Sequence, residues 1–178
     1  EQKIYSLQGV PFVVPGGRFN EMYGWDSYFI GVGLLIDGQI GKAIAIAENF
    51  KYQIIHYGKI LNANRSYYLT RTQPPLYSSL LIEIAKKKIP SLDWLRSHLE
   101  TVILEYNTVW MVQGNRLTPT GLNRYKADGI GMPFEVEPGH FDDVLEPYAK
   151  KYNLPIREFE KQYLQRTIVD AELDMYFV

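Results

Sequence analysis

Residues 15–28, Pro-Gly-Gly-Arg-Phe-Asn-Glu-Met-Tyr-Gly-Trp-Asp-Ser-Tyr, form the stretch around which the rest of the chain is organised. Its Pro-Gly-Gly start predicts a sharp turn, because glycine adopts the positive φ angles that other residues avoid. Arg18 follows at the exit of the turn, and acids and aromatic residues come next without the spacing of an amphipathic helix. Aromatic rings stack on the apolar faces of sugars, and Arg and Asp bind hydroxyl groups. The stretch therefore indicates carbohydrate as the first ligand class to consider.

Four helices are predicted on the C-terminal side of this stretch. Residues 25–36 are apolar nearly all round, as in a helix buried within a larger body. Residues 39–56 repeat apolar positions at helical spacing. A third helix follows Pro75 and ends in the lysines at 86–88, and a fourth begins after a Ser91 cap and continues to about residue 112. The fourth helix carries an apolar series down one face, made of Leu95, Leu99, Val102, Tyr106 and Val109.

The remaining segments complete an all-α pattern. The opening residues as far as Val14 are apolar and interrupted by proline, which suits an extended lead-in. Residues 59–75 and 113–140 are polar loops of a length that usually carries function. Helix is predicted again at about 141–152 and after Pro155, whereas the last residues, Ala171 to Val178, end without a cap. Helix pairs without alternating strands indicate an all-α fold.

Composition excludes several functions. The chain has 178 residues, a net charge of −1 and no cysteine, so it lacks the basic surface that nucleic acid or an anionic membrane requires. It contains no membrane-spanning run, no signal-peptide pattern and neither a phosphate-binding nor a serine-hydrolase motif. His56, His98 and His140 are too far apart for a metal motif, and no cofactor is indicated. The sequon at residues 64–66 is interpreted as unused.

Glycoside hydrolysis requires two carboxylates, one on either side of the scissile bond. Spacing alone suggests Asp26 and Glu135 as that pair. The alternative is structural, since Asp26 can cap the helix that it starts and Glu21 can pair with Arg18 at the surface. This structural alternative is favoured for Glu21 and for the acids at residues 142–143.

Two arginines and two tyrosines in the loops are further candidates for a role in the site. Arg18 and Arg71 lie in loops where helix-face charges are absent, so a ligand-facing role is favoured for both. Tyr67 and Tyr68 are adjacent aromatics in a connection, and such pairs usually pack it onto the body.

Three blocks of the chain resemble the trehalases, the inverting glycosidases that split α,α-trehalose into two glucose molecules. Residues 15–28, PGGRFNEMYGWDSY, resemble the first signature of the family, and residues 56–75, HYGKILNANRSYYLTRTQPP, resemble its second block. Residues 121–152 resemble the fungal neutral branch, which is cytoplasmic. The resemblance implies an (α/α)6 barrel with trehalose as its small-molecule partner.

Eight residues match substrate-binding positions of the family in this resemblance. They are Arg18, Trp25, Asp26, Asn62, Arg71, Thr72, Gln73 and Glu135. In this alignment Asp26 binds the sugar and is no longer a candidate for the acid.

The family's general acid and base would both lie beyond Val178. Residues 1–178 are therefore expected to be the N-terminal portion of a trehalase-like catalytic domain, inactive alone, from a longer protein that is called the parent protein below. Twelve barrel helices with their loops need on the order of 250 residues or more. Two alternatives remain open: another glucosidase on the same barrel, and a non-catalytic sugar-binding or regulatory protein. Half a barrel would also leave apolar helix faces bare, so the isolated segment should be molten or aggregated.

Overall fold

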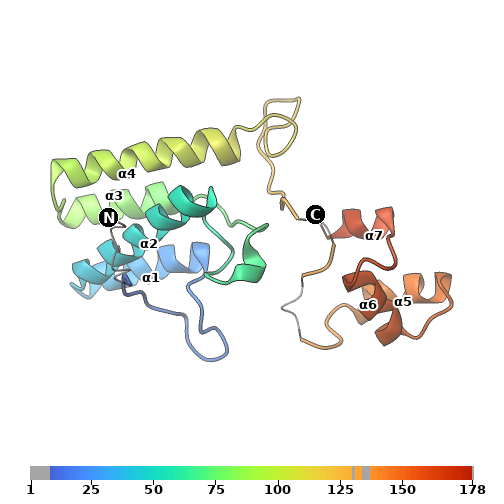
Figure 1. Ribbon diagram of the computed structural model, residues 1–178. Helices are drawn as coiled ribbons and strands as arrows, with labels where there is room; N and C mark the ends of the chain where they lie inside the picture. The colour runs from blue at the N-terminus through green and yellow to red at the C-terminus, as the bar shows by residue number, and fades with distance from the viewer. Residues whose placement is uncertain (1–8, 130, 134–136, 178) are drawn as a thin grey trace, which may run out of the picture. The chain divides into compact units, whose positions relative to one another are not determined.

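The computed structural model describes residues 9–129, 131–133 and 137–177, and these belong to two compact units (Figure 1). The first unit ends at Lys126 and the second begins at Ala127. Every regular element in these ranges is helical, and β-structure within them is confined to isolated bridges. The all-α prediction is confirmed.

The first unit holds the four predicted helices, which are followed without interruption by a π-helical segment. Its elements are α1 (Gly24–Ile36), α2 (Ile40–Tyr57), the short 3-10 helix η1 (Ser66–Tyr68), α3 (Tyr77–Lys87), α4 (Leu92–Glu105) and the π-helix η2 (Tyr106–Trp110). Ser91 caps α4 as predicted, because its Oγ accepts from the Trp94 N–H at 3.0 Å. Gly58 ends α2 at φ 77°, a left-handed conformation that favours glycine.

Helices α1 to α4 enclose one apolar core. α2 contacts each of the other three helices, and α3 contacts α1 and α4 (Figure 1). Gly31 lets α1 approach α3 closely, since a Cβ at this position would lie 2.6 Å from Leu80 Cδ1. The buried residues of this core include Met22, Leu35, Ile46, Phe50, Ile54, Tyr77, Leu80 and Ile84.

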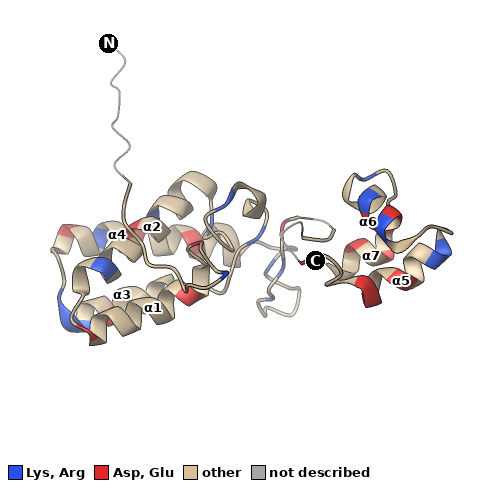
Figure 2. Cartoon of the chain, turned by 90° about the horizontal axis from the view of Figure 1, so that it is seen from below, with Lys and Arg blue, Asp and Glu red and all other residues tan. Residues whose placement is uncertain are grey.

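The apolar side chains of α1 are only partly covered. Its buried residues are Gly24, Ser27, Gly31 and Leu35, whereas Phe29 is 62% and Ile36 is 74% exposed. Asp26 is its only charged residue, and the helix is drawn almost entirely tan in Figure 2. The apolar residues predicted for a helix surrounded by neighbours are present. Within this unit, however, other helices cover only one face of α1.

The fully buried side chains of helix α4 are polar, while its apolar Trp94 and Val102 pack partly buried against the core. Its buried side chains are His98, Thr101 and Glu105, while Leu99 and Tyr106 of the predicted apolar series are each 54% exposed. His98 joins three helices, since its Nδ1 lies 2.5 Å from the Tyr77 hydroxyl of α3 and its Nε2 lies 3.1 Å from Glu48 Oε1 of α2. Glu48 also accepts from the Trp94 indole N–H at 2.5 Å.

The second unit contains three further helices around its own core. These are α5 (Asp142–Lys151), α6 (Ile156–Leu164) and α7 (Ala171–Tyr176). The first two confirm the predicted helices, and Pro155 is the N-cap residue of α6. The sequence did not predict α7, which begins where the Asp170 carboxylate accepts from the backbone N–H groups of Glu172 and Leu173.

Among the described residues, no helix has the length and apolar character that crossing a membrane would need.

Candidate functional site

The turn at the start of residues 15–28 is a tight hairpin. Gly16 and Gly17 have φ values of 96° and 61°, and Gly16 and Phe19 exchange backbone hydrogen bonds of 3.1 and 3.0 Å. The predicted turn chemistry is therefore present. Arg18 lies in this hairpin as an exposed residue, and its guanidinium carbon lies 5.4 Å from the centre of the Phe19 ring.

Two loops that are distant in sequence run together at the N-terminus of α1. The first loop is residues 15–23 and the second loop is residues 58–76. An isolated bridge joins Tyr23 to Ala63 across the two loops. The Gly24 N–H donates to the Asn62 carbonyl at 3.2 Å, and the Met22 N–H donates to Asn64 Oδ1 at 2.9 Å. The backbone N–H groups at the start of α1 thus find partners in the second loop.

Gln73 is the side chain that holds the predicted residues together. Its Oε1 accepts from the Trp25 backbone N–H at 2.5 Å, and its Nε2 donates to Asn62 Oδ1 at 3.0 Å. The Trp25 N–H can only donate, which fixes the orientation of the Gln73 amide and then that of Asn62. Both Gln73 groups are engaged inside the protein, so Gln73 positions its neighbours. The NH₂ group of Asn62 remains as a donor on a half-buried side chain.

Arg71 and Thr72 belong to the same assembly through the backbone. The Asn62 N–H donates to the Arg71 carbonyl at 3.0 Å, and Leu61 forms a bridge with Thr72. Thr72 is fully buried, and its hydroxyl donates to the Ile60 carbonyl at 2.5 Å. The Tyr125 hydroxyl donates to the Thr72 carbonyl from a third segment. Thr72 therefore fixes the loop, while Arg71, which is half-buried, extends from it.

Trp25 and Asp26 occupy the first turn of α1. The Trp25 side chain is 48% exposed, so a face of the ring is accessible. Asp26 is half-buried. The alternative that Asp26 caps its own helix is wrong: the N-cap residue is Tyr23, and no side chain there accepts a capping hydrogen bond.

The predicted surface pair of Glu21 and Arg18 is also corrected. Glu21 Oε1 accepts from Arg65 Nε at 3.0 Å and from Nη2 at 2.8 Å, and Glu21 Oε2 accepts from the Tyr23 hydroxyl at 3.2 Å. The Arg65 guanidinium lowers the pKa of the Glu21 carboxyl, chiefly through these hydrogen bonds. The pair ties the first loop to the second, and residues 44 positions apart could not be matched from spacing.

The aromatic pair in the second loop divides into two roles. Tyr68 is 6% exposed and packs with Leu61 and Ala63, which confirms its predicted packing role. Tyr67 is 45% exposed, so the same prediction is wrong for Tyr67.

Glu135, the remaining predicted site residue, lies outside the described residues. Glu137 and His140 are exposed. Across the described ranges, no three or more His, Cys, Asp or Glu side chains are grouped as metal ligands would be.

Two cavities border the second loop, and Trp25, Asn62 and Gln73 line neither. One, of about 310 Å³, lies between α2 and the second loop and is lined by Tyr52, Gln53, Asn64 and Arg65 among others. The other, of about 400 Å³, includes Pro75, Glu105 and Trp110 in its wall. Sequence reasoning did not single out Glu105 or Trp110, because each looks like an ordinary helix residue in isolation.

Comparison with known proteins gives one consistent result. A family model described as Trehalase matches residues 1–178. The cytosolic neutral trehalases of Kluyveromyces lactis and Neurospora crassa are 47% and 48% identical over 175 and 177 residues, which is 96% and 97% of this chain. The chain spans only 23% and 24% of the length of these relatives.

A solved structure agrees with the sequence comparisons. The neutral trehalase Nth1 from Saccharomyces cerevisiae matches with a TM-score of 0.84 at 46% identity, over 93% of this chain and 31% of that one. The predicted fold class, part of an (α/α)6 barrel, is thereby supported at both levels of comparison.

Proposed function

The chain belongs to the trehalase family, and from this premise we propose that its parent protein hydrolyses α,α-trehalose to two glucose molecules with inversion. In such a reaction an acid protonates the bridging oxygen while a base drives water onto the opposite face of the sugar. We assign neither carboxylate to residues 1–178, which span about a quarter of the related trehalases. A cytosolic location is part of the proposal, because these relatives carry that name.

Residues 1–178 would supply part of the substrate-binding wall. The observation that supports this most is the Gln73 bridge, which holds Trp25 and Asn62 beside the Arg71 backbone. The arrangement offers an accessible indole face for a sugar ring and a free amide donor for a hydroxyl. Arg18, Arg71, Asp26 and Glu135 are proposed to bind further hydroxyl groups, with Thr72 and Gln73 holding the loop in place.

The test is steady-state kinetics of the parent protein on trehalose. Arg18→Ala and Arg71→Ala should each lower kcat/KM by at least about 10-fold, because a hydrogen bond from a charged group contributes about 1.5–3 kcal/mol. Arg96→Ala is the matched control, since Arg96 lies on the exposed surface of α4 and pairs with Asp93. Wild-type kinetics in both loop variants would refute the assignment.

Assays on the same preparation of the parent protein also distinguish the two alternative functions. A trehalase should cleave trehalose in preference to maltose and kojibiose, whereas another glucosidase should prefer one of the latter two. Trehalose binding measured by calorimetry without turnover of any of the three sugars would identify a non-catalytic sugar-binding protein.

A further inference from the structure

The side chain of Tyr125 reaches the second loop from a segment that lies outside the proposed substrate-binding wall. Its hydroxyl donates to the Thr72 carbonyl, although the two residues are 53 positions apart in the sequence. Thr72 is fully buried, and its neighbours in the chain, Arg71 and Gln73, both belong to the proposed wall. Tyr125 thus binds the backbone of the wall at the point between these two residues.

Two different segments hold the two peptide groups that flank the Thr72 Cα atom. The Asn62 N–H donates to the Arg71 carbonyl at 3.0 Å, which fixes the first peptide group. The Tyr125 hydroxyl donates to the Thr72 carbonyl, which fixes the second. Because each peptide group is planar, fixing both leaves the backbone little freedom to rotate at Thr72. The directions in which Arg71 and Gln73 leave the loop are therefore set in part by Tyr125.

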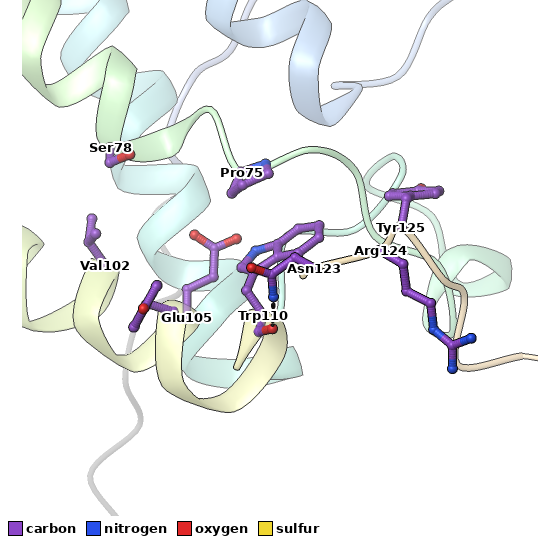
Figure 3. Close-up of a pocket in the computed structure, with 9 residues that line it drawn as sticks. Pro75, Ser78, Val102, Glu105, Trp110, Asn123, Arg124 and Tyr125 are labelled. Carbon is purple, nitrogen blue, oxygen red and sulfur yellow. Dashed lines mark hydrogen bonds between the residues drawn. The ribbon is translucent and has the colours of Figure 1, made fainter. Parts of the chain in front are cut away.

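Tyr125 itself is attached to the end of the π-helix η2. The segment after η2 folds back on itself, and the Arg124 N–H donates to the Arg116 carbonyl at 2.8 Å. The Asn123 side chain donates through Nδ2 to the Trp110 carbonyl, a hydrogen bond drawn as a dashed line in Figure 3. Tyr125 directly follows these two anchored residues. Its backbone is therefore supported by η2 and not by the loop that it contacts.

The surroundings of the Tyr125 hydroxyl bring it close to the Arg71 side chain. Burial raises the pKa of Tyr125, while the nearby charges of Arg116 and Arg71 lower it. The hydroxyl remains protonated at neutral pH and can keep donating to the Thr72 carbonyl. Arg71 is half-buried, and its charge acts on the same hydroxyl that fixes its backbone.

We propose that Tyr125 is a positioning residue for trehalose hydrolysis, which fixes the Thr72 peptide group and thereby holds Arg71 in place for the sugar. The inference rests on the proposed function. Without the hydroxyl, the buried Thr72 carbonyl loses its donor, and the loop shifts to find another partner. A displacement of about 1 Å in a positioned group is enough to slow an enzyme.

The experiment is a double-mutant cycle in the full-length parent protein, with kcat and KM measured on trehalose. Tyr125→Phe should lower kcat/KM by about 3- to 10-fold, the effect of one neutral hydrogen bond. The loss should be divided between kcat and KM in the same proportion as in Arg71→Ala. Made in the Arg71→Ala background, Tyr125→Phe should cost less than about 2-fold, because the residue through which it acts is gone.

Tyr106→Phe is the matched control. Tyr106 lines the same cavity of about 400 Å³ as Tyr125, and the two side chains are 54% and 56% exposed. The Tyr106 hydroxyl makes no hydrogen bond to any residue that the structure describes. Removing it should leave kcat and KM at their wild-type values, so this variant measures the effect of losing an exposed hydroxyl alone.

Three outcomes would overturn the proposal. Wild-type kinetics in Tyr125→Phe together with a loss in Arg71→Ala would refute the positioning role and leave the proposed function intact. An equal loss from Tyr125→Phe in both backgrounds would show that its effect does not pass through Arg71. Wild-type kinetics in Arg71→Ala would refute the assignment of Arg71 in the proposed function, and the positioning role with it.

Discussion

At the scale of single residues, the candidate site depends on which side chains meet. The sequence predicted Trp25, Asn62, Arg71, Thr72 and Gln73 as site residues, and the structure brings them together. It did not predict that Gln73 binds the Trp25 backbone N–H, because the two residues are 48 positions apart. Pairing at such distances depends on the tertiary fold, which residue spacing does not encode.

Gly24 tests the precision of this contact. A Cβ at Gly24 would lie 2.8 Å from Gln73 Oε1 and 3.0 Å from Gln73 Cβ, so Gly24→Ala should displace Gln73. We expect a loss of about 1–3 kcal/mol in the free energy of unfolding of the parent protein, measured by chemical denaturation. Gly33→Ala on the same helix is the control, since nothing lies within 4 Å of its Cβ position. That variant should be neutral or stabilised by up to about 1 kcal/mol, and equal effects in both would contradict the close contact.

Glu105 gives a pH dependence of known sign. Its pKa is about 7 when folded and near 4.5 when unfolded, so the folded state binds the extra proton between these values. Its contribution to stability is present below pH 4.5 and is lost as the pH rises through 7. Between pH 5.5 and 8, wild type should lose about 2 kcal/mol relative to Glu105→Gln. The measurement is denaturant unfolding of both proteins at each pH, and a constant difference would show that the carboxyl titrates normally.

The comparison with Glu105→Gln also removes the effect of His98. Burial lowers the pKa of His98, so protonating it as the pH falls below about 6.5 destabilises the fold in both proteins. This opposite trend cancels in the difference, which leaves the Glu105 term.

At the scale of secondary structure, helices were predictable and their packed faces were not. Periodicity located α1 to α6, and the Ser91 cap was identified from its residue type. The short α7 was missed because its cap, Asp170, precedes only six helical residues. In α4 the apolar series was expected to form one face, yet His98 and Glu105 are the buried side chains. Their partners lie on other helices, and no local pattern signals the π-helix that follows.

The contacts of His98 show how α4 is attached through polar groups. Tyr77→Phe removes the hydroxyl that meets His98 Nδ1 and leaves a buried ring nitrogen unpaired. We expect it to lower the free energy of unfolding of the parent protein by about 1–3 kcal/mol in chemical denaturation. Tyr57→Phe is the control, since Tyr57 lies at the end of α2 and is 46% exposed. It should change the free energy of unfolding by less than about 0.5 kcal/mol. Similar losses in the two variants would mean that the His98 contact is not what stabilises α4.

At the scale of the whole molecule, many large apolar side chains are exposed. Phe29, Ile36, Leu92 and Ile103 are each more than half exposed, and they belong to α1 and α4. An apolar face of a helix is normally buried against a second helix. A chain that spans about a quarter of its relatives would have such neighbours in the rest of the parent protein.

Residues 1–178 expressed alone should therefore be molten or aggregated. We expect helical far-ultraviolet circular dichroism together with a weak near-ultraviolet signal and strong binding of the dye ANS. Calorimetry should show no sharp transition. A cooperative melt with a well-resolved near-ultraviolet spectrum would show that these apolar faces need no partner.

The Gln73 bridge has a practical consequence for anyone recombining trehalase sequences. The amide spans residues that a gene-fragment exchange would normally separate, because Trp25 lies in one block and Asn62 and Gln73 lie in the other. A chimera that takes only one block from a distant relative combines Trp25 of one parent with Asn62 and Gln73 of the other. Crossover points in a shuffled library are best placed before Pro15 and after Tyr77, so that both blocks come from the same donor.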